Sequence, residues 1–123
     1  MSEHDSQVRL FSWAAAMAEL LPDLAGLYAI PNGGYRAKAT AARLKAEGVK
    51  RGVPDVHLPV ARGGYLGCWI EMKWGSNKPT EDQVRWLGWL ADQGHFVTVC
   101  YTWEAAADTL ERYLRGRIVK GEA

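Results

Sequence analysis

The apolar residues of the chain recur with two different spacings. Recurrence every three or four residues is typical of an amphipathic helix, and alternation of apolar and polar residues is typical of a strand. In the stretch 66–74, for example, Cys68 and Ile70 fall at every second position, and Glu71 and Lys73 at the positions between. These patterns predict helices at about 5–21, 36–47, 80–94 and 103–115, and strands at about 27–30, 56–60, 66–74 and 95–101.

The predicted elements follow one another in the order helix, strand, helix, strand, strand, helix, strand, helix. Strands 56–60 and 66–74 are close in sequence, which predicts an antiparallel hairpin. A helix then separates strand 66–74 from strand 95–101, which favours a parallel crossover. Strand 95–101 is rich in β-branched and aromatic residues, so we expect it at the centre of the sheet. The predicted fold class is therefore α/β, with a mixed β-sheet flanked by helices.

Length and composition predict one domain. The chain has 123 residues, of which 48% are hydrophobic and 24% charged, and this is ordinary for a single globular domain spanning residues 1–123. Residues 116–123 are expected to form a frayed tail. No apolar run approaches the roughly 18 residues of a membrane span, and the charged first residues do not resemble a secretory signal. We therefore expect a cytoplasmic protein that does not bind a membrane.

Positive charge is concentrated in the middle of the chain. Residues 36–78 contain nine basic residues and three acidic ones, whereas the rest of the chain contains six basic and eleven acidic residues. Such segregation is typical either of a face that binds a polyanion or of a solvated basic helix without a partner.

Three charged residues of the predicted hairpin carry the candidate chemistry. Glu71 and Lys73 are two positions apart on one strand and therefore share a face, and Asp55 lies on the neighbouring strand. Two close carboxylates repel each other unless a cation lies between them, and Mg²⁺ prefers such oxygen ligands. Asp55, Glu71 and the Met72 backbone carbonyl would hold the metal, while Lys73 would hold or deprotonate the attacking water or stabilise charge on a phosphate. The alternative is a cross-strand ion pair on a solvated sheet face.

The pair Pro54-Asp55 followed by Glu71-Met72-Lys73 on the next strand resembles the signature of PD-(D/E)xK nucleases. Nearly the whole chain is similar to a stand-alone VRR-NUC domain, a compact nuclease module of phage and bacterial proteins. The similarity includes these further segments: Glu3 and Gln7 at the start of the first helix, Ile30-Pro31-Asn32-Gly33-Gly34, Gly48-Val49-Lys50-Arg51-Gly52-Val53, Ile70, and Gln83 before Trp86-Leu87.

The resemblance implies a restriction-endonuclease-like core and metal-dependent hydrolysis of DNA phosphodiesters, with Mg²⁺ as the cofactor and Mn²⁺ as a substitute. It also implies a homodimer that resolves Holliday junctions or other branched DNA, located in a bacterial cell or a phage-infected host cell. By position, Asp55 and Glu71 would be metal ligands and Lys73 the catalytic lysine. Glu3 would reach the metal directly or through water, and Gln83 would be a supporting polar residue.

The basic segment would position the DNA backbone without reading its sequence. The expected DNA-binding residues are Lys50, Arg51, Arg36, Lys38, Arg43, Lys45 and Lys78. Trp74 would border the DNA cleft, and His57 would be either a partner of the metal ligands or a strand-surface residue without a role. Two functional alternatives stay open at this point, namely a nuclease directed to flaps or nicks and a non-catalytic DNA-binding module on the same fold. No nucleotide-binding motif indicates a small-molecule cofactor.

Overall fold

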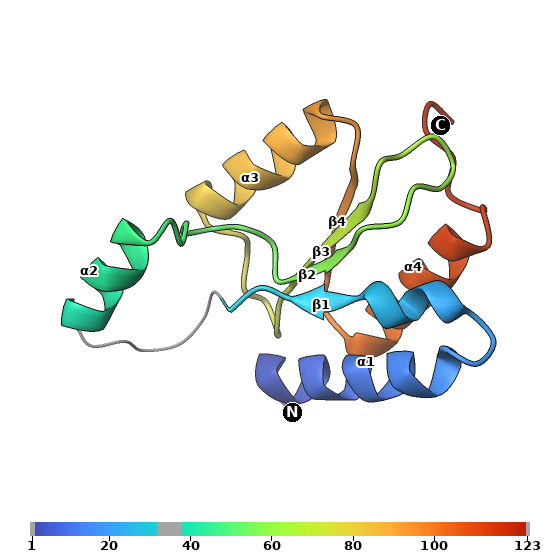
Figure 1. The fold of residues 1–123 in the computed structure, drawn as a ribbon, viewed down its shortest axis with the longest axis horizontal. Helices are drawn as coiled ribbons and strands as arrows, with labels where there is room; N and C mark the ends of the chain where they lie inside the picture. Colours follow the sequence, from blue (N-terminus) through green and yellow to red (C-terminus); the bar gives the residue numbers. More distant parts are fainter. Residues whose placement is uncertain (1, 32–37, 123) are drawn as a thin grey trace.

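The computed structural model describes residues 2–31 and 38–122 and shows one four-stranded sheet with helices on both faces (Figure 1). Its elements, in chain order, are α1 (Glu3–Met17), the 3-10 helix η1 (Pro22–Gly26), β1 (Tyr28–Ala29), α2 (Lys38–Ala46), β2 (Val56–Leu58), β3 (Cys68–Met72), α3 (Glu81–Asp92), β4 (Phe96–Cys100) and α4 (Trp103–Leu114). The predicted α/β class and the predicted order of elements are confirmed.

The strands lie in the order β1-β2-β3-β4. β2 pairs antiparallel with both β1 and β3, and β4 pairs parallel with β3, so the hairpin and the crossover are both confirmed. The prediction that strand 95–101 is central is wrong, because β4 lies at the edge of the described sheet. Its apolar sequence is explained by α3 and α4, which both contact it, rather than by two neighbouring strands.

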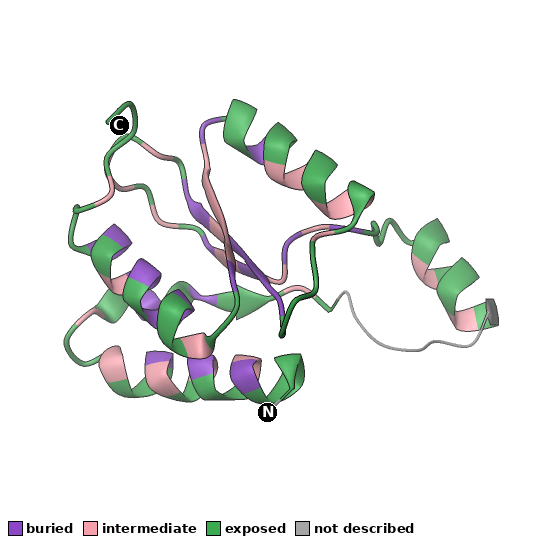
Figure 2. Cartoon of the chain, turned by 180° about the vertical axis from the view of Figure 1, so that it is seen from behind, coloured by how far each residue is buried: buried purple, intermediate pink, exposed green. Residues whose placement is uncertain are grey.

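The two faces of the sheet carry different side chains. The even-numbered residues of β2 and β3 point into the core with α1 and α4, as shown by the buried Leu58 and Ile70 together with Leu10 and Leu110. The odd-numbered residues therefore point to the opposite face. Figures 1 and 2 show α1 and α4 on one side of the sheet and α3 on the other, with the buried segments concentrated along the sheet and the inner surfaces of α1 and α4.

The C-terminal tail contacts the body within the described residues 116–122, and its fraying stays a prediction. Lys120 N–H donates to the Gly63 carbonyl (2.8 Å), and Ile118 packs against the core. Gly63 adopts a φ of 58°, and a Cβ there would lie 2.1 Å from the Ile118 carbonyl oxygen. The tail is thus held by a close approach of two backbone segments that only glycine permits. None of the helices in the described residues is long and apolar enough to cross a membrane.

Candidate active site

Asp55 lies immediately before β2 and connects to the end of β3. Its Oδ2 accepts a hydrogen bond from the Met72 backbone N–H (2.8 Å). The next residue, Lys73, donates its N–H to the Cys100 carbonyl on the opposite side of β3. Because successive N–H groups of a strand point to opposite neighbours, the Met72 N–H points toward β2, where the ladder has ended. The Asp55 carboxylate replaces the missing backbone acceptor and is thereby fixed beside Glu71.

Glu71 and Lys73 share the odd-numbered face of β3, as the alternation predicts. Both are buried, with 1% and 8% of their surface exposed, and Lys73 Nζ lies 3.4 Å from Glu71 Oε2. The other carboxylate oxygen, Oε1, is buried and has no hydrogen-bond partner. The alternative of a solvated surface ion pair is therefore wrong, because neither side chain is solvated. The neighbouring Asp55 carboxyl interacts with Glu71 but offers no donor once both groups are ionised, so the ionised pair leaves this oxygen unsatisfied at a cost in free energy.

Burial dominates the electrostatics of the two carboxyl groups. The pKa of Glu71 is raised to about 8, first by burial and then by the Asp55 charge, against the lowering effect of the Lys73 ammonium. Burial also raises the pKa of Asp55, against the lowering effect of the hydrogen bond from Met72. The pair therefore resists carrying two negative charges unless a cation joins it.

The donor set fits a hard divalent cation. It consists of the carboxylates of Asp55 and Glu71 and the backbone carbonyl of Met72, all oxygen donors. In the ranges 2–31 and 38–122 the structure contains no group of three or more His, Cys, Asp or Glu side chains suited to hold a metal. Mg²⁺ is commonly held by one or two carboxylates and keeps several waters, so two carboxylates meet its needs. The unpartnered Glu71 Oε1 is the atom that such a cation would satisfy.

A cleft of about 930 Å³ lies between α1 and the site, and Asp55 and Met72 line it whereas Glu71 and Lys73 do not. Glu3 and Gln7 line it on the helix side, and Asp55 and Met72 line it on the sheet side. The structure thus brings Glu3 to the same cleft as Asp55, although not into a group of three potential metal ligands with Asp55 and Glu71. Its role as an acid acting through water stays a prediction.

Gln83 is engaged in capping α3. Its Oε1 accepts from the Thr80 N–H (2.8 Å), and its own N–H donates to Thr80 Oγ1 (3.2 Å). The sequence predicts this capping box, and it is confirmed. The supporting role of Gln83 in the active site stays a prediction.

Most of the predicted DNA-binding residues are exposed on the surface. Arg43 forms an ion pair with Glu47 (3.8 Å) in which both side chains are largely solvated. Exposed too are Lys45, Lys50, Arg51 and Lys78. Arg36 and the side chain of Lys38 lie outside the described part of the chain.

The predictions missed a row of rings on the odd-numbered face of the sheet. His57 Nδ1 lies 2.6 Å from the Tyr28 hydroxyl, the His57 ring stacks on Trp69 with centroids 3.7 Å apart, and Trp69 Nε1 donates to His95 Nδ1 (3.3 Å). Burial, with a smaller effect from His95, lowers the pKa of His57 to about 4. The described contacts of His57 are thus with aromatic rings rather than with Asp55. The pairing register is the signal that would have found the row, because it places Tyr28 and Trp69 on either side of His57.

Comparison with known proteins agrees with this geometry. The family model of the VRR-NUC domain matches residues 3–103, which is most of the chain. The chain belongs to the VRR-NUC domain family. VRR-NUC domains are nuclease domains, so this one has a nuclease-type function in DNA processing.

A solved structure described as a VRR_NUC domain protein has the same fold as this VRR-NUC domain. Its TM-score is 0.79 at 23% sequence identity, over 94% of this chain and 90% of the other. A comparison with curated proteins gives no significant match.

Proposed function

We propose that this VRR-NUC domain is an Mg²⁺-dependent endonuclease that cleaves branched DNA and acts as a homodimer on four-way junctions. The observation that carries the proposal is the buried Glu71 carboxylate, whose Oε1 lacks a partner beside Asp55 and Lys73. A purely structural ion pair in a protein interior would satisfy its remaining lone pairs.

Each residue of the site has a distinct role. Asp55 and Glu71 would hold the cation, and the hydrogen bond from the Met72 N–H fixes the orientation of the Asp55 carboxylate. When bound, a divalent cation supplies Lewis-acid activation of the phosphodiester and lowers the pKa of the attacking water. The ion pair to Glu71 Oε2 positions the Lys73 ammonium, which stabilises the negative charge that develops on the phosphate.

The cleft itself offers little attraction to a DNA backbone. Among the described residues, those lining it include no lysine or arginine. The phosphates must therefore be held by basic residues around the cleft, and Lys50 and Arg51 are exposed a few positions before Asp55. These two residues support DNA as the substrate that approaches the site.

The homodimer has both a functional and a structural rationale. A four-way junction has approximate two-fold symmetry, and one active site per subunit of a symmetric dimer would make the two related cuts. On α3, the rings of Trp86 and Trp89 contact edge to face at 5.6 Å, and 54% of Trp89 is exposed. Asp82 and Arg85 pair beside them along a groove of about 330 Å³. In a two-fold contact, Asp82 of each copy can pair with Arg85 of the other copy. We therefore assign the second copy of the chain to this face of α3.

The experiment that tests the function compares labelled DNA substrates: a four-way junction, a flap, a nicked duplex and a linear duplex. Each is incubated with Mg²⁺, with Mn²⁺ and with EDTA. We expect paired, symmetric nicks confined to the junction and abolished by EDTA. Cutting of flaps or nicks instead would contradict the junction specificity but retain the chemistry. Binding without cutting of any substrate would contradict the nuclease and favour a non-catalytic DNA-binding module.

A further inference from the structure

The segment 38–51, which we call the basic arm, precedes the active-site residue Asp55 in the chain. Figure 1 shows its helix, α2, standing to one side of the sheet and of the other three α-helices. No described helix or strand packs extensively against α2. The described part of the arm thus stands apart from the packed body of the molecule.

The helix of the arm has no buried face. None of the described side chains of α2 is buried, and only Thr40 and Leu44 are half-buried. Its C-terminal end is nevertheless well defined, because the Val49 N–H donates to the Leu44 carbonyl (2.9 Å) and the Gly48 N–H donates to the Lys45 carbonyl (3.1 Å). These two bonds, with Gly48 at a φ of 97°, form a Schellman motif.

Length and packing together make this helix marginal on its own. Helices shorter than about 12–15 residues are barely stable in water unless tertiary packing supports them. α2 has 9 residues and lacks such packing. Packing within the described chain therefore contributes little to the stability of this helix.

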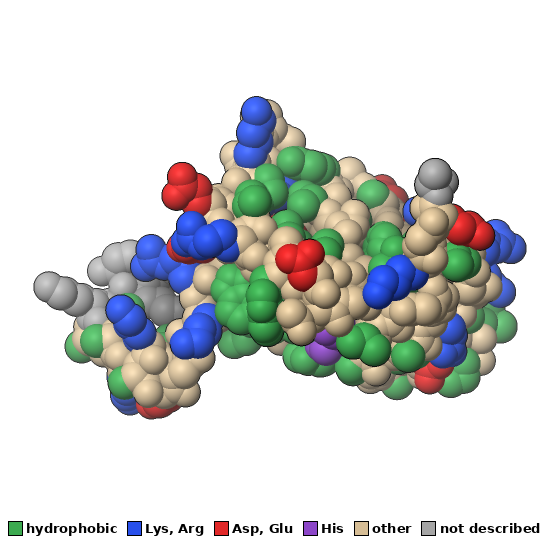
Figure 3. Space-filling view, turned by 90° about the horizontal axis from the view of Figure 1, so that it is seen from above, with side chains coloured by type: hydrophobic (Ala, Val, Ile, Leu, Met, Phe, Trp, Pro, Cys, Tyr) green, Lys and Arg blue, Asp and Glu red, His purple; other side chains and the backbone are tan. Residues whose placement is uncertain are grey.

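The charge of the arm is suited to a polyanion. Residues 38–51 contain five basic residues and one acidic residue. The Arg43–Glu47 pair is exposed at 73% and 59%, and such a solvated pair contributes little stability. Figure 3 shows Lys and Arg side chains gathered over α2 at one end of the molecule.

We propose that the basic arm is a DNA clamp, whose helix becomes stable when its lysines and arginines contact the backbone phosphates of the duplex that flanks the cleavage site. This inference rests on the proposed action on DNA. The basic residues of the arm would then attract the phosphates, since no lysine or arginine among the described residues lines the cleft. Because phosphate contacts carry no sequence information, the arm would favour a position next to the branch point rather than a base sequence.

The first test measures the salt dependence of binding of the full chain to a four-way junction in EDTA, where no cleavage occurs. The arm variant is Lys45→Ala/Lys50→Ala/Arg51→Ala. Each phosphate contact contributes about 0.9 to the slope of log K against log salt, so the slope should fall by up to about 2.7. Between about 50 and about 200 mM salt, the wild type should then lose roughly 40-fold more affinity than the variant.

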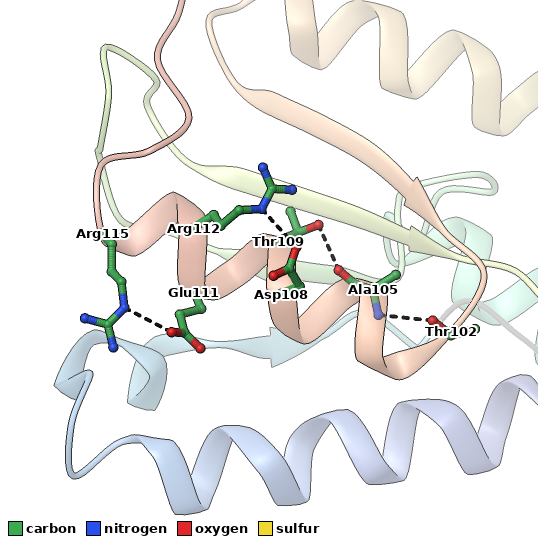
Figure 4. Close-up of polar contacts among 7 residues, drawn as sticks. All are labelled: Thr102, Ala105, Asp108, Thr109, Glu111, Arg112 and Arg115. Carbon is green, nitrogen blue, oxygen red and sulfur yellow. Dashed lines mark hydrogen bonds and ion pairs between the residues drawn. The ribbon is translucent and has the colours of Figure 1, made fainter.

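The matched control removes three positive charges from the other end of the molecule. It is Arg112→Ala/Arg115→Ala/Arg117→Ala, and the first two arginines, in and directly after α4, pair with Asp108 and Glu111 (Figure 4). The control should keep the wild-type slope. Equal slopes for the arm and control variants would overturn the proposal.

The second test separates folding of the arm from its charge. Ala41→Gly/Ala42→Gly keeps every charge and weakens the helix, and should weaken DNA binding about fivefold per glycine without moving the unfolding midpoint of the body. Hydrogen exchange of amides 42–49 should slow when junction DNA is added. Unchanged affinity of the glycine variant, or unchanged exchange, would overturn the proposal. Neither readout requires cleavage, so failure of the arm and failure of the nuclease are distinguishable.

Discussion

Replacing Glu71 with glutamine removes the charge of the buried carboxylate while keeping its size and one acceptor oxygen. In the folded protein the pKa of Glu71 is raised from 4.5 to about 8, chiefly by burial. Between these two values the folded state holds a proton that the unfolded chain has released. The free energy of unfolding of the wild type therefore decreases as the pH rises through this window.

The size of the effect follows from the shift in pKa. One pKa unit corresponds to about 1.36 kcal/mol. Because the folded carboxyl ionises only near pH 8, the titration of Glu71 should lower the free energy of unfolding of the wild type by about 3 kcal/mol between about pH 5.5 and about pH 8.5. With a urea m-value of about 1–3 kcal/mol/M, the difference in midpoint between wild type and Glu71→Gln should change by about 1–3 M across this range. Added Mg²⁺ should restore the wild type at high pH and leave the variant unchanged.

The assay is urea unfolding followed by tryptophan fluorescence at the two pH values, in EDTA and in Mg²⁺. The glutamine variant is its own control, because every other titrating group is retained. A difference in midpoint that stays constant with pH would refute the conclusion that Glu71 is buried with a raised pKa. A pH-dependent difference that Mg²⁺ leaves unchanged would refute its role as a cation ligand.

Three further predictions concern residues around the site and the tail. Asp55→Ala leaves the Met72 N–H without its acceptor and should lower the free energy of unfolding, measured in urea, by about 1–3 kcal/mol. Asp55→Asn keeps an acceptor oxygen and should lower it less, and equal losses in the two variants would contradict the hydrogen bond. The pKa of His57 is lowered to about 4, so its NMR signals should not titrate between about pH 5.5 and about pH 8. The contribution of neutral His57 to the free energy of unfolding should be lost only as the pH falls below about 6.5 toward 4, and an NMR titration midpoint near 6.5 would contradict the burial of the ring. Gly63→Ala places a Cβ against the Ile118 carbonyl oxygen and should lower the free energy of unfolding by about 1–3 kcal/mol. The variant should also expose the tail to trypsin, and an unchanged digestion pattern would contradict this expectation.

Local chemistry and periodicity account for what the sequence predicted correctly. The alternation along strand 66–74 places Glu71 and Lys73 on one face, and the short connection to strand 56–60 brings Asp55 beside them. The capping box of Thr80 and Gln83 is equally local, and the structure confirms it. Such features depend on residues a few positions apart, so a single sequence contains them.

Features that depend on tertiary packing were not predictable in the same way. The edge position of β4 follows from which strands pair, which its apolar composition does not reveal. The tail approaches the body where Gly63 meets the Ile118 carbonyl, and these residues are more than fifty positions apart. The stacking of His57 on Trp69 depends on register and side-chain orientation, and the burial of Glu71 depends on how the surrounding segments cover it.

Junction cleavage by Lys73→Met tests whether Asp55, Glu71 and Lys73 form the catalytic centre. Methionine approximates the length of the lysine side chain and removes its charge, so the variant should remain folded. With Mg²⁺ present, we expect metal-dependent nicking by the wild type and no detectable nicking by the variant, with junction binding retained by both. Nicking by the folded variant at the wild-type rate would rule out a catalytic role for Lys73.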